Sequence, residues 1–419
     1  MKLTFVSHAG YIYESNGVSI FTDPWTKGKA FNDSWALHTK AIEVDYSKIK
    51  YIFVSHEHPD HFSFPTLKGI PENLRSEISI LYQEHSSKRL LEAFKKLNFK
   101  KVIELPIYKW YGLSKEVELY CGSAGSMDSF LVIRENGKSI LNLNDCAFTD
   151  KQYKYIHRQI GDVDILFTQF SFANWVGNDG DINAEAKGKI ETIKLQMQIF
   201  HPKFVIPFAS FVAFCNKENC RQNAWANTPE YIQQLGIPNL NFMYPGDSID
   251  IDDPKFNSPL AVQKYMEDMK NVKIDPVPAS VSFEDILTAA KENIDIFCKK
   301  IPKLFRRSIS PFSVFINDLD RSIFVDPANG VVKEINDKKC RFSMCSQVCW
   351  YTFKYSWGTG TLMVSAMYLD NEPREKYSRY FFFQNMLSTE YVSFSNPEKG
   401  ISTVKFFWRK KWEVLYRFV

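Results

Sequence analysis

The sequence predicts an α/β protein with two domains. Strand-like and helix-like segments alternate through roughly the first 250 residues, the pattern of an α/β fold. The chain has 419 residues, more than one hydrophobic core usually organises, so a second domain is expected. An aspartate- and proline-bearing stretch at 249–254, followed by Pro276 and Pro278, marks the predicted boundary. The expected domains are therefore 1–252 and 253–419.

Short apolar runs bounded by turn residues predict the strands of the first domain. Residues 51–54, Tyr-Ile-Phe-Val, form a continuous β-rich apolar run, typical of a strand buried on both faces. Asn136-Gly137 predicts a hairpin turn between two further strands. In all, strands are expected at 3–6, 11–14, 18–22, 51–54, 118–121, 129–134, 139–143, 164–168 and 204–207, and helices at 86–97 and 184–200.

The second domain is expected to be smaller and of the α+β type. Residues 280–305 have a helical pattern, and residues 312–419 are rich in strand-forming side chains. The aromatic and basic segment 406–412 could contact a membrane or nucleic acid, but its alternation favours a final strand with a polar outer face.

Composition excludes several classes of partner. The net charge of +4 is small beside 52 basic and 48 acidic side chains, so nucleic acid is not an expected partner. No apolar stretch is long enough for a signal peptide or a membrane span, which favours a cytoplasmic protein. The eight cysteines form no C-x-x-C pair and are expected to be reduced, with the group Cys340, Cys345 and Cys349 serving in packing.

The run His56-x-His58-x-Asp60-His61 follows a predicted buried strand directly. Two imidazoles one residue apart can converge on one ion, and the carboxylate and third imidazole can serve a second ion. A solvated polar loop is the alternative, but three histidines and one aspartate in six residues favour a metal site. Asp145, at the end of a predicted strand, is expected to bridge two divalent ions, iron or zinc, unless it is an ordinary turn residue.

Two further polar residues close predicted strands near this loop. Asp23 is expected to orient a ligating imidazole, or else to belong to an ordinary Asp-Pro turn. His8 either lines the mouth of the site or caps a turn. Together with Asp60, His8 is taken as a candidate catalytic residue.

With these residues the chain resembles the metallo-β-lactamase superfamily and, more narrowly, the catalytic part of CMP-N-acetylneuraminate hydroxylase. The resemblance implies an αββα sandwich for the first domain. The His/Asp run indicates only the superfamily, and the other segments, in the same order, narrow it. The matching segments are Ser7-His8-Ala9, Thr22-Asp23-Pro24-Trp25, Ser55-His56-Glu57-His58-Pro59-Asp60-His61, Met127-Asp128, Asn144-Asp145-Cys146 and Pro207-Phe208-Ala209-Ser210, with a weaker likeness at 358–387.

Three departures from that family bear on the site. Its members carry an N-terminal Rieske domain that supplies electrons, whereas this sequence starts directly at the metal-binding domain. The family's histidine before the Met-Asp pair is Ala124 here, and its later histidine is Asn216, beside Cys215. The resemblance therefore implies that each metal loses an imidazole, which could leave open positions, recruit Asp128 or Cys215, or reduce the site to one ion.

Three functions remain open on the sequence. The first is a di-iron oxygenase-like hydroxylase of a nucleotide-sugar or other polar small molecule, served by a separate electron-donor protein. The second is a hydrolase of an ester, amide or phosphodiester that uses metal-bound hydroxide. The third is a binding protein on a degraded metal site. Candidate substrate contacts are Asn174 and Trp175, and candidate phosphate contacts are Lys27, Lys217 and Arg221.

Overall fold

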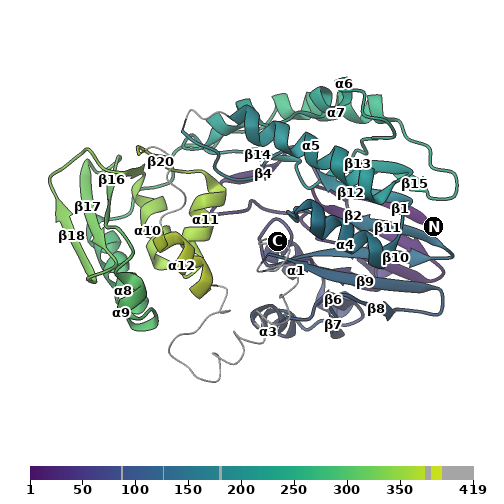
Figure 1. Ribbon diagram of the computed structural model, residues 1–419, viewed down its shortest axis with the longest axis horizontal. Helices are drawn as coiled ribbons and strands as arrows, with labels where there is room; N and C mark the ends of the chain where they lie inside the picture. The colour runs from purple at the N-terminus through teal and green to yellow at the C-terminus, as the bar shows by residue number, and fades with distance from the viewer. Residues whose placement is uncertain (86–87, 126, 179–181, 373–378, 389–419) are drawn as a thin grey trace.

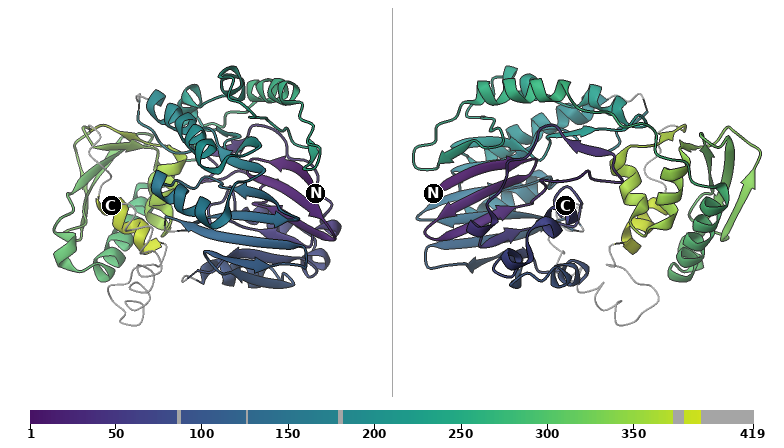
Figure 2. Two further views of the ribbon diagram at one scale, coloured as in Figure 1. Left: turned by 45° about the vertical axis from the view of Figure 1, so that its right-hand side comes forward. Right: turned by 180° about the vertical axis from the view of Figure 1, so that it is seen from behind.

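The computed structural model describes residues 1–85, 88–125, 127–178, 182–372 and 379–388, and the predicted strand at 406–412 lies outside them. Two units lie side by side (Figures 1 and 2). The larger contains two packed β-sheets with helices on their outer faces, and the smaller contains a third sheet with its own helices (Figure 1).

The first sheet has seven strands and begins at the N-terminus of the chain. Its first strands pair antiparallel and its later strands pair parallel, starting with β3 against β5. In spatial order the strands are β15 (Ser248–Asp250), β1 (Lys2–Ser7), β2 (Gly10–Ser15), β3 (Val18–Thr22), β5 (Tyr51–Phe53), β6 (Ser79–Gln83) and β7 (Lys101–Leu105).

The second sheet has six strands, of which β11, β12 and β13 run parallel. Its inner face packs on the first sheet, as the stacked rings of Tyr11 and Phe167 show, with centroids 4.3 Å apart. In spatial order the strands are β13 (Phe204–Phe208), β12 (Ile165–Gln169), β11 (Lys138–Asn142), β10 (Asp128–Glu135), β9 (Val117–Ala124) and β8 (Lys109–Gly112). A short separate pair joins β4 (Trp35–Leu37) to β14 (Val212–Phe214).

Helices cover both outer faces of this sandwich. On the first sheet, Leu67 of α1 (Phe64–Gly69) and Phe94 of α3 (Arg89–Lys96) share one core with Ile52 and Ile80. On the second sheet lie α4 (Asp150–Ile160) and α5 (Ile182–Phe200), as Figure 1 shows. The short helix α2 (Glu72–Arg75) follows α1. The expected αββα sandwich is confirmed.

The smaller unit has a five-stranded sheet packed on helices, but it contains more helix than the sequence predicts. The expectation that residues 312–419 are strand-rich is correct for the sheet and wrong for 346–354, 358–365 and 379–388, which are helical. The strands in spatial order are β18 (Val331–Ile335), β17 (Arg321–Asp326), β16 (Phe312–Ile316), β19 (Phe342–Met344) and β20 (Leu369–Asp370), and the helices are α8 (Phe283–Lys300), α9 (Lys303–Arg306), α10 (Ser346–Lys354), α11 (Gly358–Ser365) and α12 (Arg379–Ser388).

The predicted domain boundary at 252 falls between two helices that pack on each other, α6 (Pro229–Gln234) and α7 (Ser258–Lys270). Tyr265 of α7 is fully buried in the core of the sandwich and stacks on Phe211, with ring centroids 4.2 Å apart. The core of the smaller unit begins at Phe283. We therefore propose a boundary at 271–282, later than the sequence suggests.

Aromatic packing and polar contacts join the two units. The Trp175 ring stacks on Tyr368 with centroids 4.9 Å apart, and Asn219 donates to the carbonyl of Ser365 at 2.7 Å. No helix within the described residues is long and apolar enough to cross a membrane.

Candidate metal centre

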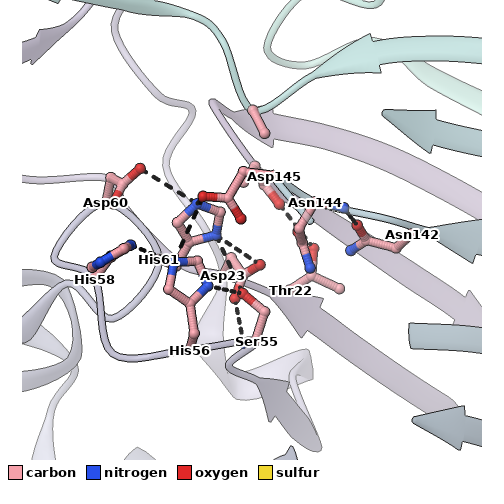
Figure 3. A network of polar contacts seen from close by, with 12 residues as sticks. Thr22, Asp23, Ser55, His56, His58, Asp60, His61, Asn142, Asn144 and Asp145 are labelled. Carbon is pink, nitrogen blue, oxygen red and sulfur yellow. Dashed lines mark hydrogen bonds and ion pairs between the residues drawn. The ribbon is translucent and has the colours of Figure 1, made fainter. Parts of the chain in front are cut away.

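The polar residues singled out in the sequence follow strand ends that meet at one edge of the sandwich. His8 follows β1, Asp23 follows β3, and the loop from Ser55 to His61 follows β5. Asp128 begins β10, and Asp145 comes three residues after β11. Because parallel strands end at the same edge of a sheet, these segments converge in space, and Figure 3 shows the loop imidazoles gathered opposite Asp145.

The first group of possible metal ligands is His56, His58 and Asp128, whose donor atoms lie within 4.8 Å of one another. His56 Nε2 faces His58 Nδ1 at 2.8 Å and Asp128 Oδ1 at 3.9 Å. Two imidazoles and one carboxylate therefore point at one small volume, as required to hold a divalent ion.

The second group is His8, Asp60 and His61, and all three side chains are buried. Asp60 Oδ2 lies 3.3 Å from both His8 Nε2 and His61 Nε2. The sequence left His8 open between lining the mouth and capping a turn. Its ring is placed for a third possibility, direct ligation beside the predicted ligands Asp60 and His61.

Asp145 faces both groups. Its Oδ2 lies 3.8 Å from His56 Nε2 in the first group and 3.8 Å from His61 Nε2 in the second. Among the described residues, Asp145 Oδ1, Asp60 Oδ1 and His61 Nε2 are buried atoms that make no hydrogen bond. Buried polar atoms are rarely left in this condition, so the donor set fits two ions with Asp145 between them.

Asp23 and Ser55 contact the ring nitrogens of His56 and His61 that face away from the proposed ions. The fully buried Asp23 accepts a hydrogen bond from the Ser55 amide at 2.7 Å, and its other oxygen lies 3.1 Å from His61 Nδ1. Ser55 Oγ lies 3.0 Å from His56 Nδ1. A carboxylate on the far nitrogen of an imidazole selects the tautomer whose near nitrogen is free to bind metal.

The pKa shifts of most of these groups favour the protonation states that bind metal. Burial lowers the pKa of His8, His56 and His58, which favours the neutral imidazole that binds metal. Burial opposes ionisation of Asp60, but His61 and His8 hold the pKa of its carboxyl well below the usual range.

His61 differs from the other histidines. Burial opposes its charged form, yet Asp60, Asp145 and Asp23 raise its pKa well above the usual value. A metal ion binding at His61 would therefore displace a proton.

Ala124 and Asn216, the two positions where the resemblance implies a histidine, have different surroundings. Ala124 on β9 pairs directly with Asp128 on β10. The Asp128 carboxylate can therefore occupy the space that a longer side chain at position 124 would fill. Asn216 donates instead to the carbonyl of Pro276 at 2.9 Å, and the Cys215 amide donates to the carbonyl of Ser34 at 2.9 Å. Cys215 joins none of the groups of possible ligands among the described residues, and the Asn216 side chain is hydrogen-bonded to Pro276, so we leave both out of the proposed centre.

The predicted substrate contacts lie mainly at the junction of the two units. Trp175 packs on Tyr368, and Asn174 donates to the carbonyl of Trp175 at 3.3 Å. Arg221 donates to the carbonyl of Tyr368 at 2.9 Å. These contacts indicate packing roles, while nothing in the structure distinguishes Lys27 or Lys217 as a phosphate ligand.

Lys189 is a residue that the sequence analysis missed. It lies on α5, and its ammonium group donates to Gln169 Oε1 at the end of β12, next to the strand that leads to Asp145. Burial lowers the pKa of Lys189, while the charge of Asp145 opposes this effect. The sequence pattern of the helix does not distinguish Lys189 from the exposed lysines of α5. Only the packing of α5 on the sheet shows that this side chain points inward.

Comparison with known protein families identifies the larger unit. Residues 2–209 match the family described as Beta-lactamase superfamily domain. These residues form a β-lactamase superfamily domain. The match ends at Ala209, so it covers the two sheets, apart from the edge strand β15, and every residue of both donor groups.

Curated relatives of the chain include a putative Rieske 2Fe-2S iron-sulfur protein of Mycolicibacterium smegmatis, 26% identical over 62% of this chain and 55% of the relative. Cytidine monophosphate-N-acetylneuraminic acid hydroxylase of Danio rerio is 25% identical over 60% of this chain and 46% of the relative. The chain thus spans about half the length of these relatives. The solved structure of CmlA, a diiron β-hydroxylase from Streptomyces venezuelae, matches with a TM-score of 0.37 and 17% identity over 50% of this chain and 44% of CmlA.

Proposed function

We propose that the chain is a metal-dependent hydroxylase that uses two iron ions. The observation that carries this proposal is the composition of the two donor groups. Each contains two imidazoles and one carboxylate, the ligand set of non-haem iron oxygenases, and Asp145 stands between them. Relatives named as hydroxylases support the same chemistry.

The residues have distinct proposed roles. His56, His58 and Asp128 would hold one ion, and His8, Asp60 and His61 would hold the other. Iron bound at these positions would supply the redox chemistry that dioxygen activation requires. Asp23 keeps His61 in the ligating tautomer, and the enclosed Lys189 ammonium offers a cation to an anionic group of the substrate.

The electron donor and the substrate follow from the same proposal. Hydroxylation by dioxygen consumes two electrons, and relatives named as Rieske iron-sulfur proteins support delivery by a Rieske-type protein or domain. A nucleotide-sugar is the first substrate to test, because a curated relative is named for one. Location in the cytoplasm stays a prediction.

Iron-loaded and zinc-loaded protein provide the test. With a chemical reductant, iron-loaded protein should consume dioxygen and show oxygen-dependent absorption changes. The zinc-loaded sample should do neither, because zinc has no accessible redox state. Hydrolysis of an ester, amide or phosphodiester by zinc-loaded protein under nitrogen would overturn the proposal in favour of a hydrolase.

A further inference from the structure

A cavity of about 760 Å³ lies over α1, α2 and α3, on the outer side of the first sheet. Its volume is in the range of small-molecule sites. One acidic side chain, Glu92, lines it, against five basic ones and the half-exposed ring of Phe64. The basic residues are Lys68, Arg75, Lys88, Arg89 and Lys96.

Most of these positive charges have no acidic partner among the residues that the structure describes. Glu92 pairs with Lys95, which is not among the lining residues, at 3.0 Å. Within the described ranges, no ion pair joins Lys68, Arg75 or Lys96 to a carboxylate, and Arg75 Nε is buried without a hydrogen-bond partner. Cations gathered in a concave site attract anions, since low-dielectric walls focus their field.

Two of the basic residues, Lys88 and Arg89, lie at the N-terminus of α3, where a positive charge destabilises the helix. Lys88 is the N-cap residue of α3 and Arg89 its first residue, and no side chain caps this end. A helix N-terminus carries a partial positive charge, which disfavours basic side chains there and favours a bound anion. Both residues pair with acidic groups outside the cavity, Lys88 with Glu104 and Arg89 with Glu57.

We propose that this cavity binds a small polyanion that carries two or more phosphate groups. Lys68, Arg75 and Lys96 would contact the phosphates from α1, α2 and α3, and the amides at the start of α3 would face the same charge. A concave site of this volume suits a small molecule better than an acidic protein surface, which would need a broad, flat basic face. The site borders the metal loop, because Arg89 pairs with Glu57, the residue between His56 and His58.

Calorimetric titration of the metal-loaded full chain with inorganic pyrophosphate tests this site. The double variant Lys68→Gln with Lys96→Gln should bind at least about ten-fold more weakly, since even one lost charge-assisted contact to phosphate weakens binding by about that factor. The matched control is Lys109→Gln with Lys115→Gln, which removes two exposed charges from outside the cavity lining and should bind as the parent does.

Two results would overturn the proposal. The first is the absence of pyrophosphate binding to the parent protein, which would leave an acidic protein as the better partner for these charges. The second is unchanged binding by the Lys68 and Lys96 double variant together with loss of binding on Asp145→Ala, which would place pyrophosphate at the metal centre.

Discussion

Replacement of Asp23 by asparagine isolates one position of the metal centre. Asp23 is fully buried and has a positive φ of 39°, a backbone conformation that asparagine tolerates well. The asparagine side chain would keep an acceptor for the Ser55 amide, now bonded at 2.7 Å, but would present an NH₂ group to His61 Nδ1. His61 would then lose the partner that leaves its Nε2 free for metal.

The expected loss of metal affinity is moderate, because Asp23 contacts His61 and not the proposed ion itself. Loss of such an orienting partner typically weakens metal binding about 10- to 100-fold, or roughly 1.4–2.7 kcal/mol. The loss should fall on the second position, where His61 is a proposed ligand, and spare the position assigned to His56, His58 and Asp128. Stepwise competition with a chromophoric chelator measures the two affinities separately.

The matched control is Asp253→Asn, which removes a charge from an exposed aspartate paired with Lys255. It should leave both affinities unchanged. An Asp23→Asn variant with parental affinity at both positions, or with equal losses at both, would refute the assignment of His61 and its orientation by Asp23.

Three further predictions concern the centre and the domain division. His8→Ala should empty the second metal position and Asp128→Ala the first, so elemental analysis that finds two metals in either variant would remove that residue from the ligand set. Lys189→Met should raise KM for an anionic substrate about ten-fold or more. The control Lys187→Met, on the exposed side of α5, should leave KM unchanged. An unchanged KM in the Lys189 variant would exclude Lys189 from substrate binding. Limited proteolysis should cut first within 271–282, and a first cut inside either sheet of the larger unit would contradict this boundary.

The strands of the larger unit could be predicted because their apolar patterns are local. The run at 51–54 is β-rich and bounded by polar residues, and the structure places β5 there. The helices of the smaller unit could not be predicted in the same way. Residues 358–365 contain no charged side chain, and their apolar and hydroxyl side chains are not separated onto two faces, so α11 has no amphipathic period that would reveal it.

The same distinction applies to the metal centre. His56, His58, Asp60 and His61 are detectable because one loop carries them all. The proximity of His8 to Asp60, and of Asp128 to His56, depends on pairing between segments far apart in the chain. Sequence spacing therefore predicts a metal site, while the tertiary structure favours Asp128 over Cys215 as the additional ligand.

Anomalous diffraction at the iron edge from crystals of iron-loaded protein tests the two-metal centre most directly. We expect two peaks beside Asp145, one contacted by His56, His58 and Asp128 and the other by His8, Asp60 and His61. A single peak, or a second peak that His8 does not contact, would contradict it.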